Sequence, residues 1–158
     1  MPTAPDTQWL TEREQATWRA YLLSTQLVDE VLDRQLQRDA KMPHAYYAIL
    51  VALSEATEHS VRMSDLARSL RYSQSRMTHA ITSLERNGWV LRRNCPNDRR
   101  SQLVSITDDG IEALGAAAPG HVDAVRRAVF DKLSAEQVAQ LGEICTTILH
   151  GLDTAPAD

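Results

Sequence analysis

Residues 73–84 of this 158-residue chain combine hydroxyl, imidazole and guanidinium side chains without an acidic residue. At 100° per residue, the apolar side chains of residues 77–84 fall on one side of a helix and polar side chains fall on the other. The polar side carries Ser75, Thr78, His79, Thr82 and Arg86, with Arg76 on its flank. Groups of these types hydrogen-bond to phosphates and to base edges in a major groove. We therefore interpret about residues 73–87 as a helix that reads nucleic acid, against the alternative of an ordinary polar surface.

A second basic feature follows in RRNCPNDRRSQLVSIT, residues 92–107, which holds four arginines. The turn-forming residues NCPND separate two strand-like runs, so we expect a hairpin over about residues 89–106. Its tip would present Arg99 and Arg100, and a slim arginine tip suits the negative potential of a minor groove. The Asp98 carboxylate can hold an arginine side chain in one orientation. Arg92 and Arg93 end the first strand, where we expect them to contact phosphates or to pair with acidic residues elsewhere.

The net charge of −4 hides a local excess of positive charge. Residues 62–100 contain nine arginines and three acidic residues, whereas the rest of the chain is acidic. A basic centre between acidic arms favours a polyanionic partner.

The sequence also bears on localisation. The chain begins without the pattern of a secretory signal, no apolar run reaches the roughly 20 residues of a membrane span, and the two cysteines are far apart in the sequence. We therefore expect a cytoplasmic protein with no membrane partner.

Two segments with helical periodicity flank the basic features in the sequence, one before them and one after them. Apolar residues recur at steps of three and four from Trp18 to Leu36, after a capping box of Thr11 and Glu14, which predicts a helix over residues 11–40. Residues 107–151 carry a second helical pattern, and the glycines and proline of GAAAPG, residues 115–120, indicate a kink or a short break within it.

The expected fold is mainly α with a small β-hairpin wing. It is a winged helix-turn-helix lobe at residues 43–106, placed between long N- and C-terminal dimerisation helices at residues 11–40 and 107–151, in a single domain that spans residues 1–158. The apolar stripes of the terminal helices exceed what a monomer of this length can cover, which predicts a two-fold homodimer.

The segments SQSRMTHAITSLERNGWVLRR and PNDRRSQLVSIT, at residues 73–93 and 96–107, resemble the MarR family of bacterial transcriptional regulators. The resemblance implies a dimer that binds a pseudo-palindromic operator in double-stranded DNA, most often as a repressor released by a small-molecule effector. By position, it implies that the major groove is met by Ser73, Gln74, Ser75, Arg76, Thr78 and His79. It matches Asp98 and Arg100 to the wing-tip pair, with Arg100 in the minor groove and Arg99 on the adjoining backbone.

The same resemblance implies an effector pocket where the dimerisation helices meet the DNA-binding lobe. Candidates to line it, against the alternative of plain core packing, are Trp18, Tyr21, His44, Tyr46 and Tyr47.

Other functions fit the residue pattern less well. The motifs of α/β-hydrolases, P-loop enzymes, zinc proteases and dinucleotide-binding enzymes do not occur, so we expect no enzyme, no cofactor and no metal site. Two sensing alternatives stay open: Glu55, Glu58 and His59 form a loose cluster for a metal, and Cys95 lies among arginines that could activate its thiol. A winged-helix module that binds protein, with weak or no DNA contact, is a further alternative.

Overall fold

The computed structural model describes residues 7–95 and 98–153, and for residues 98–100 and Asp153 it describes the backbone only. In this part of the chain six α-helices and three strands follow one another, with single 3-10 turns at Thr57–His59 and Phe130–Lys132. Their order is α1 (Glu12–Ala40), α2 (His44–Glu55), β1 (Ser60–Arg62), α3 (Met63–Ser69), α4 (Gln74–Arg86), β2 (Val90–Cys95), β3 (Asp98–Ile106), α5 (Asp108–Ala128) and α6 (Ala135–Asp153). The expected fold class, mainly helical with a small β-sheet wing, is confirmed.

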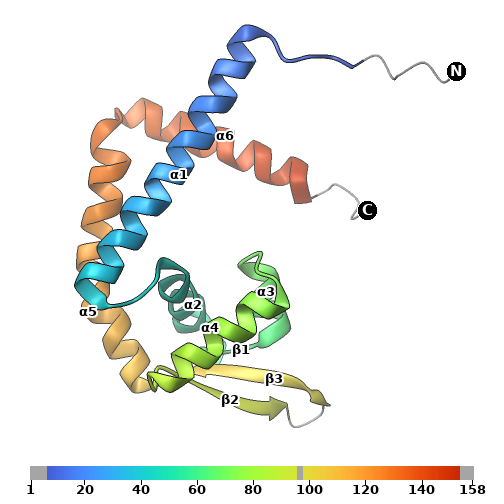
Figure 1. Cartoon of the computed structure of the whole chain (residues 1–158), viewed down its shortest axis with the longest axis vertical. Coiled ribbons are helices and arrows are strands. Elements are labelled where there is room, and N and C mark those ends of the chain that lie inside the picture. Colours follow the sequence, from blue (N-terminus) through green and yellow to red (C-terminus); the bar gives the residue numbers. More distant parts are fainter. Residues whose placement is uncertain (1–6, 96–97, 154–158) are drawn as a thin grey trace, which may run out of the picture.

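The elements separate into a lobe and a set of long helices (Figure 1). Helices α2, α3 and α4 and the sheet form the lobe, α1 and α5 pack against each other and against α2, and α6 lies at the end of the molecule away from the wing. The lobe core is apolar, and its fully buried side chains include Leu36, Ile49, Leu50, Leu53, Leu66, Met77, Ile81, Leu84, Val90 and Val104. None of the described helices is both long and apolar enough to cross a membrane.

Local capping chemistry sets where the helices begin. Thr11 and Glu14 form the predicted capping box, in which the Glu14 N–H donates to Thr11 Oγ1 at 3.2 Å and the Thr11 N–H donates to Glu14 Oε2 at 2.7 Å. Ser134 and Gln137 exchange the equivalent hydrogen bonds before α6, at 2.9 and 3.2 Å. Each pair satisfies backbone donors that the first helical turn leaves without partners.

The sheet has one strand more than the predicted hairpin. β2 and β3 form the hairpin, and β1 pairs antiparallel with β3 on its other side, which gives the strand order β1-β3-β2. Val61 lies opposite Val104, and the hydroxyls of Ser60 and Ser105 are 2.8 Å apart. β1 therefore joins the end of α2 to the base of the wing.

Helix α5 is continuous through the segment where a kink or break was predicted. It runs from Asp108 to Ala128 with Pro119 inside it, and the backbone leaves helical geometry only at Val129. Gly120, next to Pro119, faces α1, because a Cβ there would lie 3.1 Å from Gln35 Nε2, and Ala117 and Ala124 are buried. Gly120, one of the two glycines that suggested a kink or break, thus permits close packing of α1 against α5.

A tight junction joins the start of α5 to the base of the wing. The Thr107 hydroxyl donates to the carbonyl oxygen of Gly88 at 2.7 Å, and the Thr107 N–H donates to the carbonyl oxygen of Trp89 at 3.0 Å. Thr107 Oγ1 also accepts from the N–H of Gly110 at 3.0 Å, which caps α5. A Cβ on Gly110 would lie only 2.2 Å from the Trp89 carbonyl oxygen, so this position requires glycine.

Candidate nucleic-acid interface

Helix α4 is amphipathic, with one face in the lobe core and the other exposed. Its buried side chains are Met77, Ala80, Ile81 and Leu84, which are the four that the periodicity placed inside. Of the residues predicted to contact DNA on this element, all are exposed except Thr82, which is half-buried: Ser73, Gln74, Ser75, Arg76, Thr78, His79, Thr82 and Arg86. Burial of the apolar face therefore leaves a polar surface without an acidic residue in its first turn.

Both ends of α4 are closed by local hydrogen bonds. At the start, Ser73 Oγ accepts from the N–H of Arg76 at 3.2 Å, as expected of an N-cap serine. At the end, Gly88 has φ of 76°, a backbone conformation that favours glycine, and its N–H donates to the carbonyl oxygen of Glu85 at 3.0 Å. The chain can then reverse directly into β2, so that the wing begins beside the end of α4.

The hydroxyl groups of two threonines on this side of α4 already make contacts within the protein. Thr82 Oγ1 donates to the carbonyl oxygen of Thr78 at 2.8 Å, and Thr78 Oγ1 lies 4.0 Å from Met63 Sδ. Because a hydroxyl oxygen keeps acceptor capacity after it donates, Thr82 is better suited to accept from a base amino group than to donate to phosphate.

The wing is the hairpin of β2 and β3. Cys95 pairs with Asp98 across it, after a register shift between Asn94 and Cys95. The backbone places Asp98, Arg99 and Arg100 at the start of β3, at the tip of the hairpin, and their side chains lie outside the described part of the structure. Their assignment to the minor groove and the adjoining backbone therefore stays a prediction.

Arg92 has an acidic partner on α4, which is one of the two roles predicted for it. Its Nη2 lies 2.6 Å from Glu85 Oε2, its Nε lies 3.1 Å from the same oxygen, and its backbone N–H donates to Glu85 Oε1 at 3.3 Å. The two side chains are 24% and 31% exposed. This pair holds β2 against the last turn of α4, and so holds the wing against the helix that would enter the groove.

Replacing Glu85 with glutamine is expected to lower the free energy of unfolding by about 1–2 kcal/mol, since the charge-assisted hydrogen bonds to the half-buried Arg92 are lost. Urea unfolding followed by circular dichroism measures the change. Asp65→Asn is the matched control, because Asp65 pairs with Arg68 at 3.2 Å on an exposed surface and should contribute less than about 0.5 kcal/mol. Equal losses in the two variants would contradict the special position of Glu85.

The five residues predicted for an effector pocket lie in two places. Trp18 and Tyr21 stack on each other on α1, with ring centroids 5.9 Å apart, and both are about half exposed. His44, Tyr46 and Tyr47 lie at the start of α2. The structure does not bring these two groups together.

The start of α2 instead meets a buried histidine of α5 that the sequence did not single out. The ring of His121 lies 4.3 Å from that of Tyr47 and 5.4 Å from that of His44, measured between centroids. Burial, and secondly the neighbouring His44, lower the pKa of His121, while burial raises the pKa of Tyr47. His44 is held by α1, since its Nδ1 lies 2.9 Å from Asp29 Oδ1 and its N–H donates to Asp33 Oδ1 at 2.8 Å. This cluster joins the lobe to both long helices.

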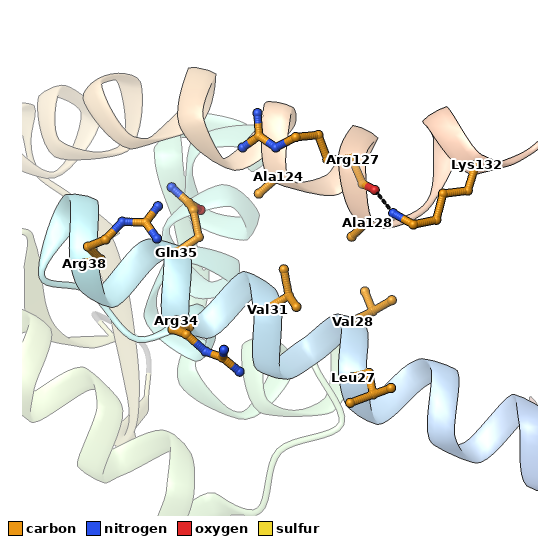
Figure 2. A pocket seen from close by; sticks show the side chains of 10 residues that line it. All are labelled: Leu27, Val28, Val31, Arg34, Gln35, Arg38, Ala124, Arg127, Ala128 and Lys132. Carbon is orange, nitrogen blue, oxygen red and sulfur yellow. Dashed lines mark hydrogen bonds between the residues drawn. The ribbon is translucent and has the colours of Figure 1, made fainter.

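A pocket of about 460 Å³ opens between α1 and the end of α5 (Figure 2). Apolar side chains from both helices and several cationic side chains surround it, and none of the five predicted effector residues is among them. Its lining residues are Leu27, Val28, Val31, Arg34, Gln35, Arg38, Ala124, Arg127, Ala128 and Lys132. Figure 2 shows the Lys132 ammonium group donating to the carbonyl oxygen of Arg127, so this cation closes the end of α5.

The sites considered for sensing alternatives are also placed by the structure. Cys95 is buried in β2, whereas reactive cysteines are partly exposed. Glu55, Glu58 and His59 are exposed at the end of α2 and in the 3-10 turn that follows. Across residues 7–95 and 98–153, no group of three or more His, Cys, Asp or Glu side chains is placed to hold a metal ion.

Comparison with known proteins gives a consistent result. The chain is 49% identical to Sco3205 of Streptomyces coelicolor, a MarR family transcriptional regulator whose crystal structure is of a complex with DNA; the match covers 98% of this chain and 97% of that one, with a TM-score of 0.92. It is 38% identical to AbsC of the same organism, covering 94% of this chain and 100% of that one, with a TM-score of 0.87.

A more distant relative extends the comparison. The transcriptional repressor MprA of Escherichia coli (strain K12) is 28% identical over 143 residues, which are 87% of this chain and 81% of that protein. The sequence profile of the MarR family matches residues 43–102, which are the lobe with α4 and most of the wing. On the full-length match to Sco3205 and the profile match to the lobe, the chain belongs to the MarR family of transcriptional regulators.

Proposed function

We propose that the chain binds double-stranded DNA as a homodimer, at a pseudo-palindromic operator, and represses transcription there until a small-molecule effector weakens binding. The observation that carries the proposal is the exposed face of α4, which is polar, has no acidic residue from Ser73 to Leu84 and lies directly beside the wing. The DNA complex of Sco3205 and the repressor name of MprA support it.

In this proposal the two basic features have different tasks. The exposed side chains of α4, with Arg76 and His79 in the first turns, meet base edges and phosphates in the major groove. Arg100 enters the minor groove and Arg99 contacts the adjoining backbone, with Asp98 orienting the arginines. The Glu85–Arg92 pair attaches the first strand of the wing to the last turn of α4.

The dimer follows from apolar surface that the single chain leaves exposed. Residues 141–152 of α6 are all exposed, although α6 carries a stripe of large apolar side chains: Leu141, Ile144, Ile148, Leu149 and Leu152. Helix α1 exposes a second apolar surface formed by Trp18, Tyr21, Leu22, Leu23, Leu27 and Val31. Apolar surface of this extent marks an interface, and a two-fold dimer buries it on both copies. Two-fold symmetry then places the two α4 helices in major grooves about 34–36 Å apart.

The test is the salt dependence of binding to operator fragments selected from the host genome. With about two phosphate contacts per protomer, and so about four per dimer, the slope of log affinity against log salt is expected to be about −3.6 or steeper. Fluorescence anisotropy with a labelled operator, and with a shuffled fragment of equal length, measures the slope and the specificity ratio. A response that is flat in salt would contradict DNA binding and favour the protein-interaction alternative.

A further inference from the structure

Tyr72 occupies the tight turn between α3 and α4, immediately before the N-cap Ser73. Its N–H donates to the carbonyl oxygen of Ala67 at 2.9 Å, and its half-buried ring packs against the lobe core. The preceding residue, Arg71, has φ of 54°, which turns the chain sharply between the two helices. Backbone and core together thus hold the Tyr72 ring at the start of α4.

The guanidinium group of Arg76 lies over this ring. Its Cζ is 4.0 Å from the ring centroid of Tyr72, which is the geometry of a cation–π contact. The backbone of Arg76 is held as well, because its N–H donates to Ser73 Oγ at 3.2 Å. Although Arg76 is exposed, its side chain therefore has a defined position in the unbound protein.

A contact through the face of the guanidinium group leaves the donors in its plane available. Arginine carries its N–H groups in that plane, in a fork that matches guanine O6 and N7 or a phosphate. An exposed arginine without such support loses rotamer freedom when it binds, which weakens the complex. The contact with the Tyr72 ring restricts the Arg76 rotamers in the unbound protein, so less conformational entropy is lost when DNA binds.

We propose that Tyr72 is the positioning residue for Arg76, and that it presents the guanidinium fork to the edge of one guanine in each operator half-site. This inference rests on the proposed function and goes beyond it, because it names the base that is read and a residue outside α4 that decides how strongly it is read. Tyr72 itself contacts no DNA in this arrangement. Its contribution appears only when Arg76 is present.

The experiment is a double-mutant cycle on the full chain. Tyr72→Leu keeps apolar bulk against the core and removes the aromatic face, whereas Tyr72→Phe keeps the face and serves as the conservative control. Each change is combined with Arg76→Ala, and anisotropy at constant salt gives Kd for the selected operator and for variants with each base pair replaced. The guanine assigned to Arg76 is the position whose replacement weakens wild-type binding but leaves Arg76→Ala unaffected.

Tyr72→Leu is expected to weaken operator binding about tenfold, to reduce the preference for that guanine, and to leave affinity for a shuffled fragment unchanged. Tyr72→Phe should remain within about twofold of wild type, and Tyr72→Leu should cause no further loss when Arg76 is already alanine. An equal loss in both Arg76 backgrounds, an equal loss on shuffled DNA, or no loss would overturn the proposal. Absence of salt-dependent binding by the wild type would instead overturn the proposed function.

A measurement on the unbound protein tests the contact without any variant. The side-chain resonances of Arg76 are expected to show an upfield ring-current shift in wild type and in Tyr72→Phe. Unshifted Arg76 resonances in the wild-type protein would overturn the positioning role, whatever the folding of the leucine variant.

Discussion

Replacing Gly110 with alanine is expected to lower the free energy of unfolding by about 3 kcal/mol or more. The added Cβ would lie 2.2 Å from the carbonyl oxygen of Trp89 and 2.7 Å from Ile106 Cγ1. The carbonyl cannot easily retreat, because it accepts the N–H of Thr107, and the Thr107 hydroxyl binds the carbonyl oxygen of Gly88. Relief therefore requires the first turn of α5 to move away from the wing. Urea unfolding followed by tryptophan fluorescence measures the loss.

Gly115→Ala is the matched control on the same helix. No atom lies within 4 Å of a Cβ at this position, and alanine has the higher helix propensity, so the free energy of unfolding should stay constant or rise by up to about 1 kcal/mol. If Gly110→Ala is as stable as Gly115→Ala, the junction between α5 and the wing is looser than the structure shows.

Replacing Ile148 with glutamate is expected to convert the dimer to monomers and to weaken operator binding by at least about 100-fold. Ile148 is 43% exposed in the single chain, within the apolar stripe of α6, so a charge there leaves the lobe intact but opposes burial against a partner. Two linked half-sites bind more tightly than one by about 10²–10⁴, and this advantage is lost in a monomer. Sedimentation velocity measures the assembly, and anisotropy measures the affinity.

Thr146→Glu adds the same charge two residues away, where a rotation of about 200° places it on the far side of α6 from Ile148. This variant should remain dimeric and bind the operator within about threefold of wild type. A dimeric Ile148→Glu variant with unchanged operator affinity would refute both the proposed interface and its role in DNA binding.

The parts of the fold that depend on neighbouring residues could be predicted from the sequence. The N-caps at Thr11, Ser73 and Ser134 were predictable because each bonds within three positions along the chain. The buried face of α4 was predictable because its four apolar residues have a helical period and a single core to meet. The fold class follows from these elements and the turn chemistry of the wing.

The features that the sequence did not predict depend on contacts between distant segments. β1 is three residues long, and only its pairing with β3, more than forty positions away, makes it a strand. The glycines and proline of residues 115–120 suggested a kink or a break, but α5 continues through them and α1 packs against Gly120. Apolar periodicity predicts a buried stripe on α1, but it does not distinguish side chains buried in the core of one chain from side chains buried against a second chain. In the single chain Leu32 and Leu36 are buried, whereas Trp18 is half exposed.

The candidate site shows the same division. The polar face of α4 could be predicted from composition, because only a few residue types donate hydrogen bonds to bases and residues 73–84 contain no acidic residue. The contact of Arg76 with Tyr72 crosses the turn between two helices, and the Glu85–Arg92 pair crosses from a helix to a strand. A signal for the second was present, since Glu85 is the only acidic residue in α4 and arginines follow it in β2.

The junction at Gly110 fixes the first turn of α5 to the base of the wing, so α5 can transmit a movement from the proposed dimerisation helices to the DNA-binding lobe. With 21 residues, α5 is about 30 Å long at 1.5 Å per residue, and its first turn is joined to the base of the wing. A tilt of about 6° at the far end would move the wing of each protomer by roughly 3 Å, so two symmetric tilts would change the distance between the wings by up to about 6 Å, which is nearly two base-pair rises of about 3.4 Å. Because a two-fold axis relates the two α5 helices of the proposed dimer, such a tilt moves both lobes symmetrically and changes the distance between them. In the proposed dimer, a change of a few degrees in the angle of α5 is therefore enough to change the half-site spacing that fits the protein by about two base pairs.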